Sequence, residues 1–232
     1  MHSGSETAVQ SSEHLPTGDD NGSCPRIDRV LLIPGLMEPR TAMLPLKYRL
    51  RRYRNDVEIW RDRYMFRNVE KSVSRLADMI SDDSSDQCFG IVTHSFGDWI
   101  ARQAIASVKD HRVGALVSLA PVMGCGHIPK LMHLLGGDLI PEIAIISDRE
   151  QAQAALDCDA KLKRMVIWAQ IDFGVHRVDL SGLPDIDVRL AAATHLSVVM
   201  QPNVHTIIEK FLFGDEQPSI NRWTNAKRQT AN

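Results

Sequence analysis

The most informative stretch of the chain is Cys88-Phe-Gly-Ile-Val-Thr-His-Ser-Phe-Gly-Asp-Trp-Ile-Ala-Arg102. It opens with a short apolar run, Phe89 to Val92, which is typical of a buried strand. A sharp turn is predicted over Thr93 to Gly97, and from Asp98 onward apolar residues recur at the spacing of a helix. A serine in a tight turn between a strand and a helix has its hydroxyl projecting above the sheet.

This pattern allows two interpretations of Ser95. In the first, the turn presents an exposed hydroxyl for nucleophilic chemistry, and Gly97 leaves room for the helix to pack close to the strand. In the second, Ser95 only caps the helix that begins near Phe96. Thr93 stands where the usual Gly-x-Ser-x-Gly pattern has its first glycine. The motif alone is therefore a weak signal, and the rest of the chain has to decide.

The length, composition and net charge of the chain indicate an ordinary globular protein. A chain of 232 residues can form one domain with a sizeable core, and 44% hydrophobic and 24% charged residues are typical of soluble proteins. A formal net charge of −2 gives no reason to expect nucleic acid as a partner. No apolar run approaches the roughly 20 residues that span a bilayer, and the N-terminus lacks a signal-peptide pattern. These features predict a cytoplasmic location. The four cysteines lie far apart, so no metal site or cofactor is predicted.

Composition also divides the chain into segments. Residues 1–25 are polar and are predicted to be a disordered tail. Residues 26–213 are predicted to form the folded domain, in which proline and glycine interrupt a cap or lid segment at 127–159. Residues 214–232 are predicted to be a polar C-terminal tail.

Apolar runs and helical patterns alternate between these tails. Such alternation predicts an α/β fold, with a mostly parallel sheet of about six strands and helices on both faces. The predicted strands are Arg29–Pro34, Val57–Trp60, Phe89–Val92, Gly114–Pro121, Lys163–Gln170 and Asp187–Ala193, and helices are predicted at Thr41–Tyr53, Val69–Ile80, after Gly97, and at Pro202–Leu212.

Four predicted strands end next to residues that could form a site. In open parallel sheets, functional groups gather at the carboxyl ends of the strands. Leu36, Ser95, Asp172 and His195 all follow such ends. This coincidence is a stronger signal than the turn around Ser95 alone.

The chain resembles the α/β-hydrolase fold family over about residues 29–212. Its Ser, Asp and His candidates follow one another in the chain order of that family. The closest likeness is to small lipase-like and esterase-like members, including the PGAP1-like group. Thr93-His-Ser-Phe-Gly97 resembles their serine turn, Ser118-Leu-Ala-Pro-Val-Met-Gly124 a strand exit, and Thr194-His-Leu-Ser197 their histidine loop. Two residues differ from the family pattern. Pro34 stands where a His is usual, and Asp98 stands where a second Gly is common after the serine turn. Asp98 lies in the first turn of the predicted helix, where the helix dipole favours a carboxylate.

The resemblance implies a serine esterase or lipase without a cofactor. Ser95 would attack a carboxylic ester of a small molecule or lipid, and His195 would act as general base and then as general acid. Asp172 would orient the imidazole. The backbone N–H groups of Leu36 and Phe96 would form the oxyanion hole.

Other residues compete for two of these roles. We prefer Asp172 as the acid because it directly follows a strand end. The competing bases are His94 and His176, and the competing acids are Asp179, Asp185 and Asp187.

Two other kinds of function are compatible with the same residues. The departures at Thr93 and Pro34 leave room for a non-catalytic binding module on the same fold. An acyltransferase, a thioesterase or an amidase would use the same three side chains, because the chemistry up to the acyl-enzyme is shared.

Overall fold

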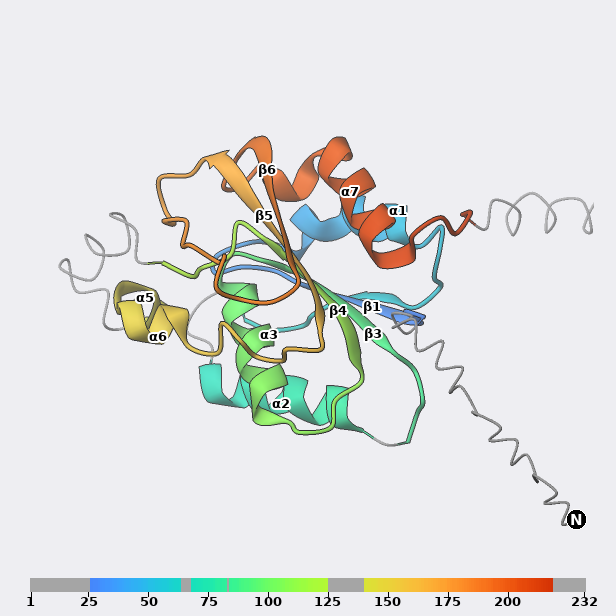
Figure 1. Cartoon of the computed structure of the whole chain (residues 1–232), viewed down its shortest axis with the longest axis horizontal. Helices are drawn as coiled ribbons and strands as arrows, with labels where there is room; N and C mark the ends of the chain where they lie inside the picture. Colours follow the sequence, from blue (N-terminus) through green and yellow to red (C-terminus); the bar gives the residue numbers. More distant parts are fainter. Residues whose placement is uncertain (1–25, 64–67, 83, 125–139, 219–232) are drawn as a thin grey trace, which may run out of the picture.

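The computed structural model describes residues 26–63, 68–82, 84–124 and 140–218 (Figure 1). In these residues a six-stranded sheet has the order β2-β1-β3-β4-β5-β6, and all neighbouring strands are parallel. The predicted fold class is therefore confirmed. The strands are β1 (Arg29–Ile33), β2 (Val57–Ile59), β3 (Phe89–His94), β4 (Val113–Leu119), β5 (Lys163–Ile171) and β6 (Ile186–Thr194).

Helices cover both faces of the sheet (Figure 1). Helices α2 and α3 pack on one face, together with residues of α5 and α6, and α1 and α7 pack on the other. The helical segments are η1 (Arg40–Met43), α1 (Leu44–Leu50), α2 (Val69–Ser81), α3 (Phe96–Ser107), α5 (Pro141–Ser147), α6 (Arg149–Gln153), η3 (Val198–Met200) and α7 (Pro202–Phe213).

The sheet separates two hydrophobic cores. Successive side chains of a strand point to opposite faces, so Leu31 and Ile33 of β1 join the core under α2 and α3, whereas Leu32 joins the core under α1 and α7. Every residue of β3 and β4 is buried because these strands lie at the centre of the sheet. Their unbroken apolar sequences follow from burial on both faces.

Some predictions fall partly outside the described residues. The N-terminal tail lies wholly outside them, and the C-terminal tail is described only as far as residue 218. Of the predicted cap segment, only residues 140–159 are described, and they contain α5 and α6. The helix predicted at Thr41–Tyr53 is shorter, because a 3-10 turn, η1, precedes α1. Among the described helices, none has the length and apolar character needed to cross a membrane.

Candidate active site

Ser95 occupies a strained turn between β3 and α3. Its backbone has φ 51° and ψ −122°, a conformation that non-glycine residues rarely adopt. The N–H of Ser95 donates to the carbonyl of Leu119 (3.0 Å), and its own carbonyl accepts from the N–H groups of Asp98 (3.1 Å) and Val122 (3.3 Å). These hydrogen bonds fix the turn from both sides, so it is held in its strained form.

Two glycines allow the loops around Ser95 to approach closely. A Cβ atom on Gly97 would lie 2.5 Å from the carbonyl oxygen of Ile33 in β1, which is far inside contact distance. A Cβ atom on Gly35 would lie 2.8 Å from the Cβ atom of Ser95. The predicted reason for Gly97, close packing of helix against strand, therefore agrees with the structure.

Threonine is accommodated where a glycine is usual. The Thr93 side chain is fully buried, and its hydroxyl donates to the carbonyl of Val117 in β4 (3.3 Å). A buried hydroxyl with a partner avoids the cost of an unsatisfied polar group. Thr93 is thus compatible with the turn.

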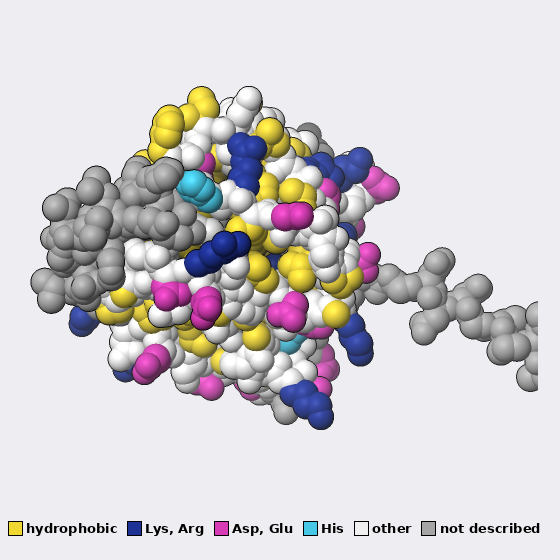
Figure 2. Space-filling model, turned by 60° about the vertical axis from the view of Figure 1, so that its left-hand side comes forward, with side chains coloured by type: hydrophobic (Ala, Val, Ile, Leu, Met, Phe, Trp, Pro, Cys, Tyr) yellow, Lys and Arg dark blue, Asp and Glu magenta, His cyan; other side chains and the backbone are white. Residues whose placement is uncertain are grey.

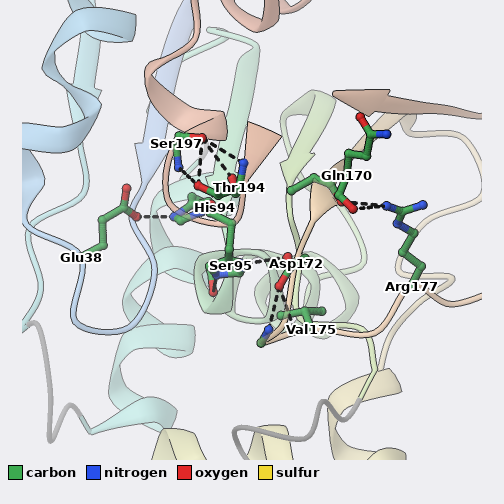
Figure 3. A network of polar contacts seen from close by, with 12 residues as sticks. Glu38, His94, Ser95, Gln170, Asp172, Val175, Arg177, Thr194 and Ser197 are labelled. Carbon is green, nitrogen blue, oxygen red and sulfur yellow. Dashed lines mark hydrogen bonds and ion pairs between the residues drawn. The ribbon is translucent and has the colours of Figure 1, made fainter. Parts of the chain in front are cut away.

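Ser95, His195 and Asp172 come together at the carboxyl ends of β3, β6 and β5. Figure 3 labels Ser95 and Asp172. The Nε2 atom of His195 lies 3.0 Å from Oγ of Ser95, and its Nδ1 atom lies 2.7 Å from Oδ2 of Asp172. A base within hydrogen-bond distance of a hydroxyl, oriented in turn by a carboxylate, is the geometry that activates a serine.

The environment of Asp172 favours its ionised form. Burial acts to raise the pKa of this carboxyl, but hydrogen bonding and charge interaction with His195 lower it, as do the backbone N–H groups of Val175 and Gly174. Both N–H groups donate to Oδ1 at 2.9 Å. The net result is a pKa below the ordinary value, so Asp172 can stabilise a protonated imidazole.

The competing residues make contacts other than the one between His195 and the Ser95 hydroxyl, and Nε2 of His94 contacts the backbone carbonyl of His195 (2.8 Å). The ring of His94 contacts Glu38 through Nδ1 (2.7 Å), and His176 is exposed. Asp179 accepts from the N–H of Ser181, and Asp187 pairs with Arg189. Asp185, in a left-handed backbone conformation, lies immediately before β6.

The capping interpretation of Ser95 does not hold. In the described structure its side chain makes no capping hydrogen bond to α3. The hydroxyl contacts His195 instead.

The two predicted oxyanion donors flank Ser95. Phe96 is the first residue of α3, where the helix dipole is positive, and Leu36 follows the end of β1. Both residues line the same pocket as Ser95. Their role as backbone donors stays a prediction.

Ser95 and His195 open into an apolar pocket of about 480 Å³. Side chains of α5 form one part of the wall, and residues at or after the ends of β1, β3, β4, β5 and β6 form the rest of its described lining. Large hydrophobic side chains at its rim are exposed, for example Phe173 (76%) and Leu196 (67%). On the face of the molecule that Figure 2 shows, hydrophobic side chains lie among charged ones. The pocket is lined by Leu36, Met37, Ser95, Phe96, Val122, Gly124, Ile143, Ile146, Ile171, Phe173, Gly174, Val175, Thr194, His195 and Leu196.

Asp98 forms a buried ion pair that the residue pattern does not predict. Its Oδ2 atom lies 2.8 Å from Nε of Arg102, one helical turn later, and both side chains are fully buried. Oδ1 of Asp98 accepts from the hydroxyl of Ser118 (2.5 Å), while Arg102 donates to the carbonyls of Val122 and Ala152 (both 3.1 Å). The pair thus connects α3, the helix after Ser95, to α6. This contact gives Asp98 a role in packing in addition to its favourable interaction with the helix dipole.

Replacing Asp98 by asparagine should destabilise the protein by about 3–5 kcal/mol, because it leaves the buried guanidinium of Arg102 without its counter-charge. The free energy of unfolding in urea measures this loss. Asp187→Asn is the control, since its partner Arg189 is exposed and such pairs contribute only about 0–1 kcal/mol. Equal losses in the two variants would contradict the prediction.

No protein-family model matches the sequence, and no curated protein matches it either. Solved structures do match. The metagenomic carboxyl esterase MGS0156 aligns with 88% of this chain and 76% of its own, with 15% identity and a TM-score of 0.57. Naproxen esterase from Bacillus subtilis aligns over 80% of this chain and 83% of its own (13% identity, TM-score 0.52). MGS-MChE2, an α/β hydrolase from a lagoon-sediment metagenome, aligns over 80% of this chain and 91% of its own (15% identity, TM-score 0.52). The chain therefore has the α/β-hydrolase fold.

Proposed function

We propose that the protein is a lipase-like or esterase-like serine hydrolase that cleaves carboxylic esters through an acyl-enzyme on Ser95. One observation carries the proposal: His195 lies between Ser95 Oγ (3.0 Å) and Asp172 Oδ2 (2.7 Å) at an apolar pocket. The fold supports it, because structural neighbours include a carboxyl esterase and naproxen esterase.

The proposed reaction has two halves. In the first, Ser95 Oγ bonds to the ester carbonyl carbon while its proton passes to Nε2 of His195, and the carbonyl oxygen becomes an oxyanion. Backbone N–H groups of Leu36 and Phe96 bind this oxyanion. Its collapse breaks the bond to the alcohol, which takes the proton from His195. In the second half, water repeats the sequence and releases the acid, while Asp172 holds the imidazole in the required tautomer.

The pocket favours an uncharged substrate with an apolar acyl or alcohol group. Its walls are mainly aliphatic and aromatic, and the only titratable side chain among the described lining residues is His195. A charged group in such a pocket would lose its hydration without gaining an ionic partner. A neutral ester would keep its apolar part in contact with the walls, where each buried methylene contributes about 0.8 kcal/mol.

Labelling with a fluorophosphonate probe, followed by peptide mass spectrometry, tests the proposal. We expect modification of Ser95, and loss of this modification after heat denaturation, because only an activated serine reacts at a useful rate. If the folded protein does not react, the site is not an assembled hydrolase site, and a non-catalytic binding module would become the better explanation.

Ile146→Trp should shift the preference toward short acyl chains. Ile146 is buried at the wall that α5 forms, and an indole there would occupy volume that a long chain needs. We expect kcat/KM to fall about 10- to 100-fold for long-chain p-nitrophenyl esters and to change little for the acetate. Ala144→Trp, on the same helix but outside the pocket lining, is the control. A uniform loss across chain lengths would contradict the assignment.

A further inference from the structure

A buried carboxyl and a buried imidazole lie beside the candidate site (Figure 3). The side chains of Glu38 and His94 are 4% and 1% exposed, and Oε2 of Glu38 lies 2.7 Å from Nδ1 of His94. Oε2 also accepts from the N–H of Gly35 (2.7 Å). On its other side, Nε2 of His94 lies 2.8 Å from the backbone carbonyl oxygen of His195.

These contacts fix the number of protons that the pair holds. A carbonyl oxygen can only accept, so Nε2 of His94 must carry a proton. Nδ1 and Oε2 are close enough to require a second proton between them, whether the ring or the carboxyl holds it. The pair is therefore neutral overall in either form, and the bridging proton is needed to keep both contacts of the ring.

The pair joins two loops that carry proposed functional groups. Gly35 and Glu38 close a short loop around Leu36, the proposed oxyanion donor, and within this loop Met37 has the strained φ of 58°. His94 precedes Ser95 in the chain and contacts the backbone of His195. A displacement at Glu38 would therefore move the Leu36 loop, and loss of the His94 contact would free the backbone of His195.

We propose that Glu38 and His94 are positioning residues for the proposed hydrolase reaction, sharing one buried proton that locks the Leu36 loop and the His195 loop around Ser95. This inference rests on the proposed function. Neither side chain touches the substrate; both act through the backbone of other residues.

Glu38→Gln distinguishes a shared proton from simple packing, because glutamine has nearly the same shape. The amide oxygen can take the place of Oε2, accept from Gly35 and accept from a protonated Nδ1 of His94. A neutral His94 ring would then present an unprotonated Nε2 to the His195 carbonyl oxygen, and a charged ring would lack a counter-charge in a buried site. Glutamine therefore cannot preserve all three contacts without cost.

The kinetic test compares wild type, Ser95→Ala, Glu38→Gln and Glu209→Gln with a soluble p-nitrophenyl ester at neutral pH. We expect Glu38→Gln to lower kcat about 10- to 100-fold, with KM changed much less, because small displacements of reacting groups reduce the rate strongly. Glu209→Gln is the matched control: it also removes a buried carboxylate, paired with Arg49 on α1, away from the candidate site. It should destabilise the fold with kcat near the wild-type value.

The outcomes separate this inference from the proposed function. If wild type and Ser95→Ala turn over the ester equally, the proposed function is overturned. If turnover depends on Ser95 but Glu38→Gln keeps the wild-type kcat while folded, only the positioning role is overturned.

Nuclear magnetic resonance of the ¹⁵N-histidine-labelled protein tests the proton directly, without activity. For His94 we expect a protonated Nε2 and a slowly exchanging, strongly downfield proton at Nδ1, assigned by its loss in His94→Gln. In Glu38→Gln, Nδ1 can keep its proton and donate it to the amide oxygen, so the neutral ring should lose the proton at Nε2, while the signal between His195 and Asp172 persists. A folded wild type that lacks the Nδ1 signal, or a folded Glu38→Gln in which both ring nitrogens of His94 stay protonated, would overturn the shared proton.

Discussion

Ser95→Ala is expected to reduce ester turnover by about 10⁴- to 10⁶-fold, because among the described lining residues Ser95 is the one whose hydroxyl lies against Nε2 of His195. The fold should be retained. In the described structure the Ser95 hydroxyl bonds to His195 and does not cap α3, and alanine tolerates the φ of 51° no worse than serine does. The kcat of the purified variant and its thermal unfolding measure the two effects.

Ser197→Ala provides the control for this variant. Ser197 lies in the histidine loop, but its hydroxyl bonds to Thr194 rather than to the ring of His195. Its loss should change kcat far less than the loss of Ser95. Turnover of Ser95→Ala at the wild-type rate in a folded protein would remove the basis of the proposed mechanism.

The sequence predicted the fold because its strongest patterns are set by burial. Central strands such as β3 and β4 need apolar residues on both faces, and this requirement produces runs that are easy to recognise. The edge strand β6 is different: its apolar residues Val188 and Leu190 are half exposed. The residue pattern predicted that a strand exists here but not that it lies at the edge of the sheet. The order of strands in a sheet depends on contacts between residues that are distant in the chain.

Candidate residues at strand ends were also predictable. Parallel strands bring their carboxyl ends to one edge, so Ser95, Asp172 and His195 could be grouped without knowledge of distances. The choice of Asp172 over Asp179 followed from its position after a strand, and the structure places it at hydrogen-bond distance from His195.

The supporting polar contacts could not be read from the sequence. Glu38 lies 56 residues from His94, and nothing in the residue pattern shows that an acid after Pro34-Gly35 turns inward. The same holds for Arg102, whose spacing from Asp98 is equally typical of an exposed helix pair. An inward-facing charge is recognised only once the surrounding packing is known.

Asp172→Asn is expected to lower kcat by about 10⁴-fold while leaving KM nearly unchanged. Asn keeps the size of the side chain, and its amide oxygen could still accept from the N–H groups of Gly174 and Val175. The atom facing His195 would then be an amide nitrogen, which donates and so favours the tautomer with the proton on Nε2. In that tautomer Nε2 cannot accept the proton of Ser95, and no negative charge stabilises the imidazolium that forms.

Asp179→Asn tests whether this effect is specific, because Asp179 is an exposed acid of the same loop and accepts a hydrogen bond from the N–H of Ser181. We expect the kcat of this variant to match that of the wild type.

The lowered pKa of Asp172 adds a second criterion, the pH dependence of kcat. A carboxyl with a pKa below the ordinary value of about 3.9 stays ionised above pH 5, so the wild type should exceed Asp172→Asn in kcat throughout pH 5 to 8. Equal kcat values of the two folded proteins anywhere in this range would show that Asp172 is not the ionised partner of His195.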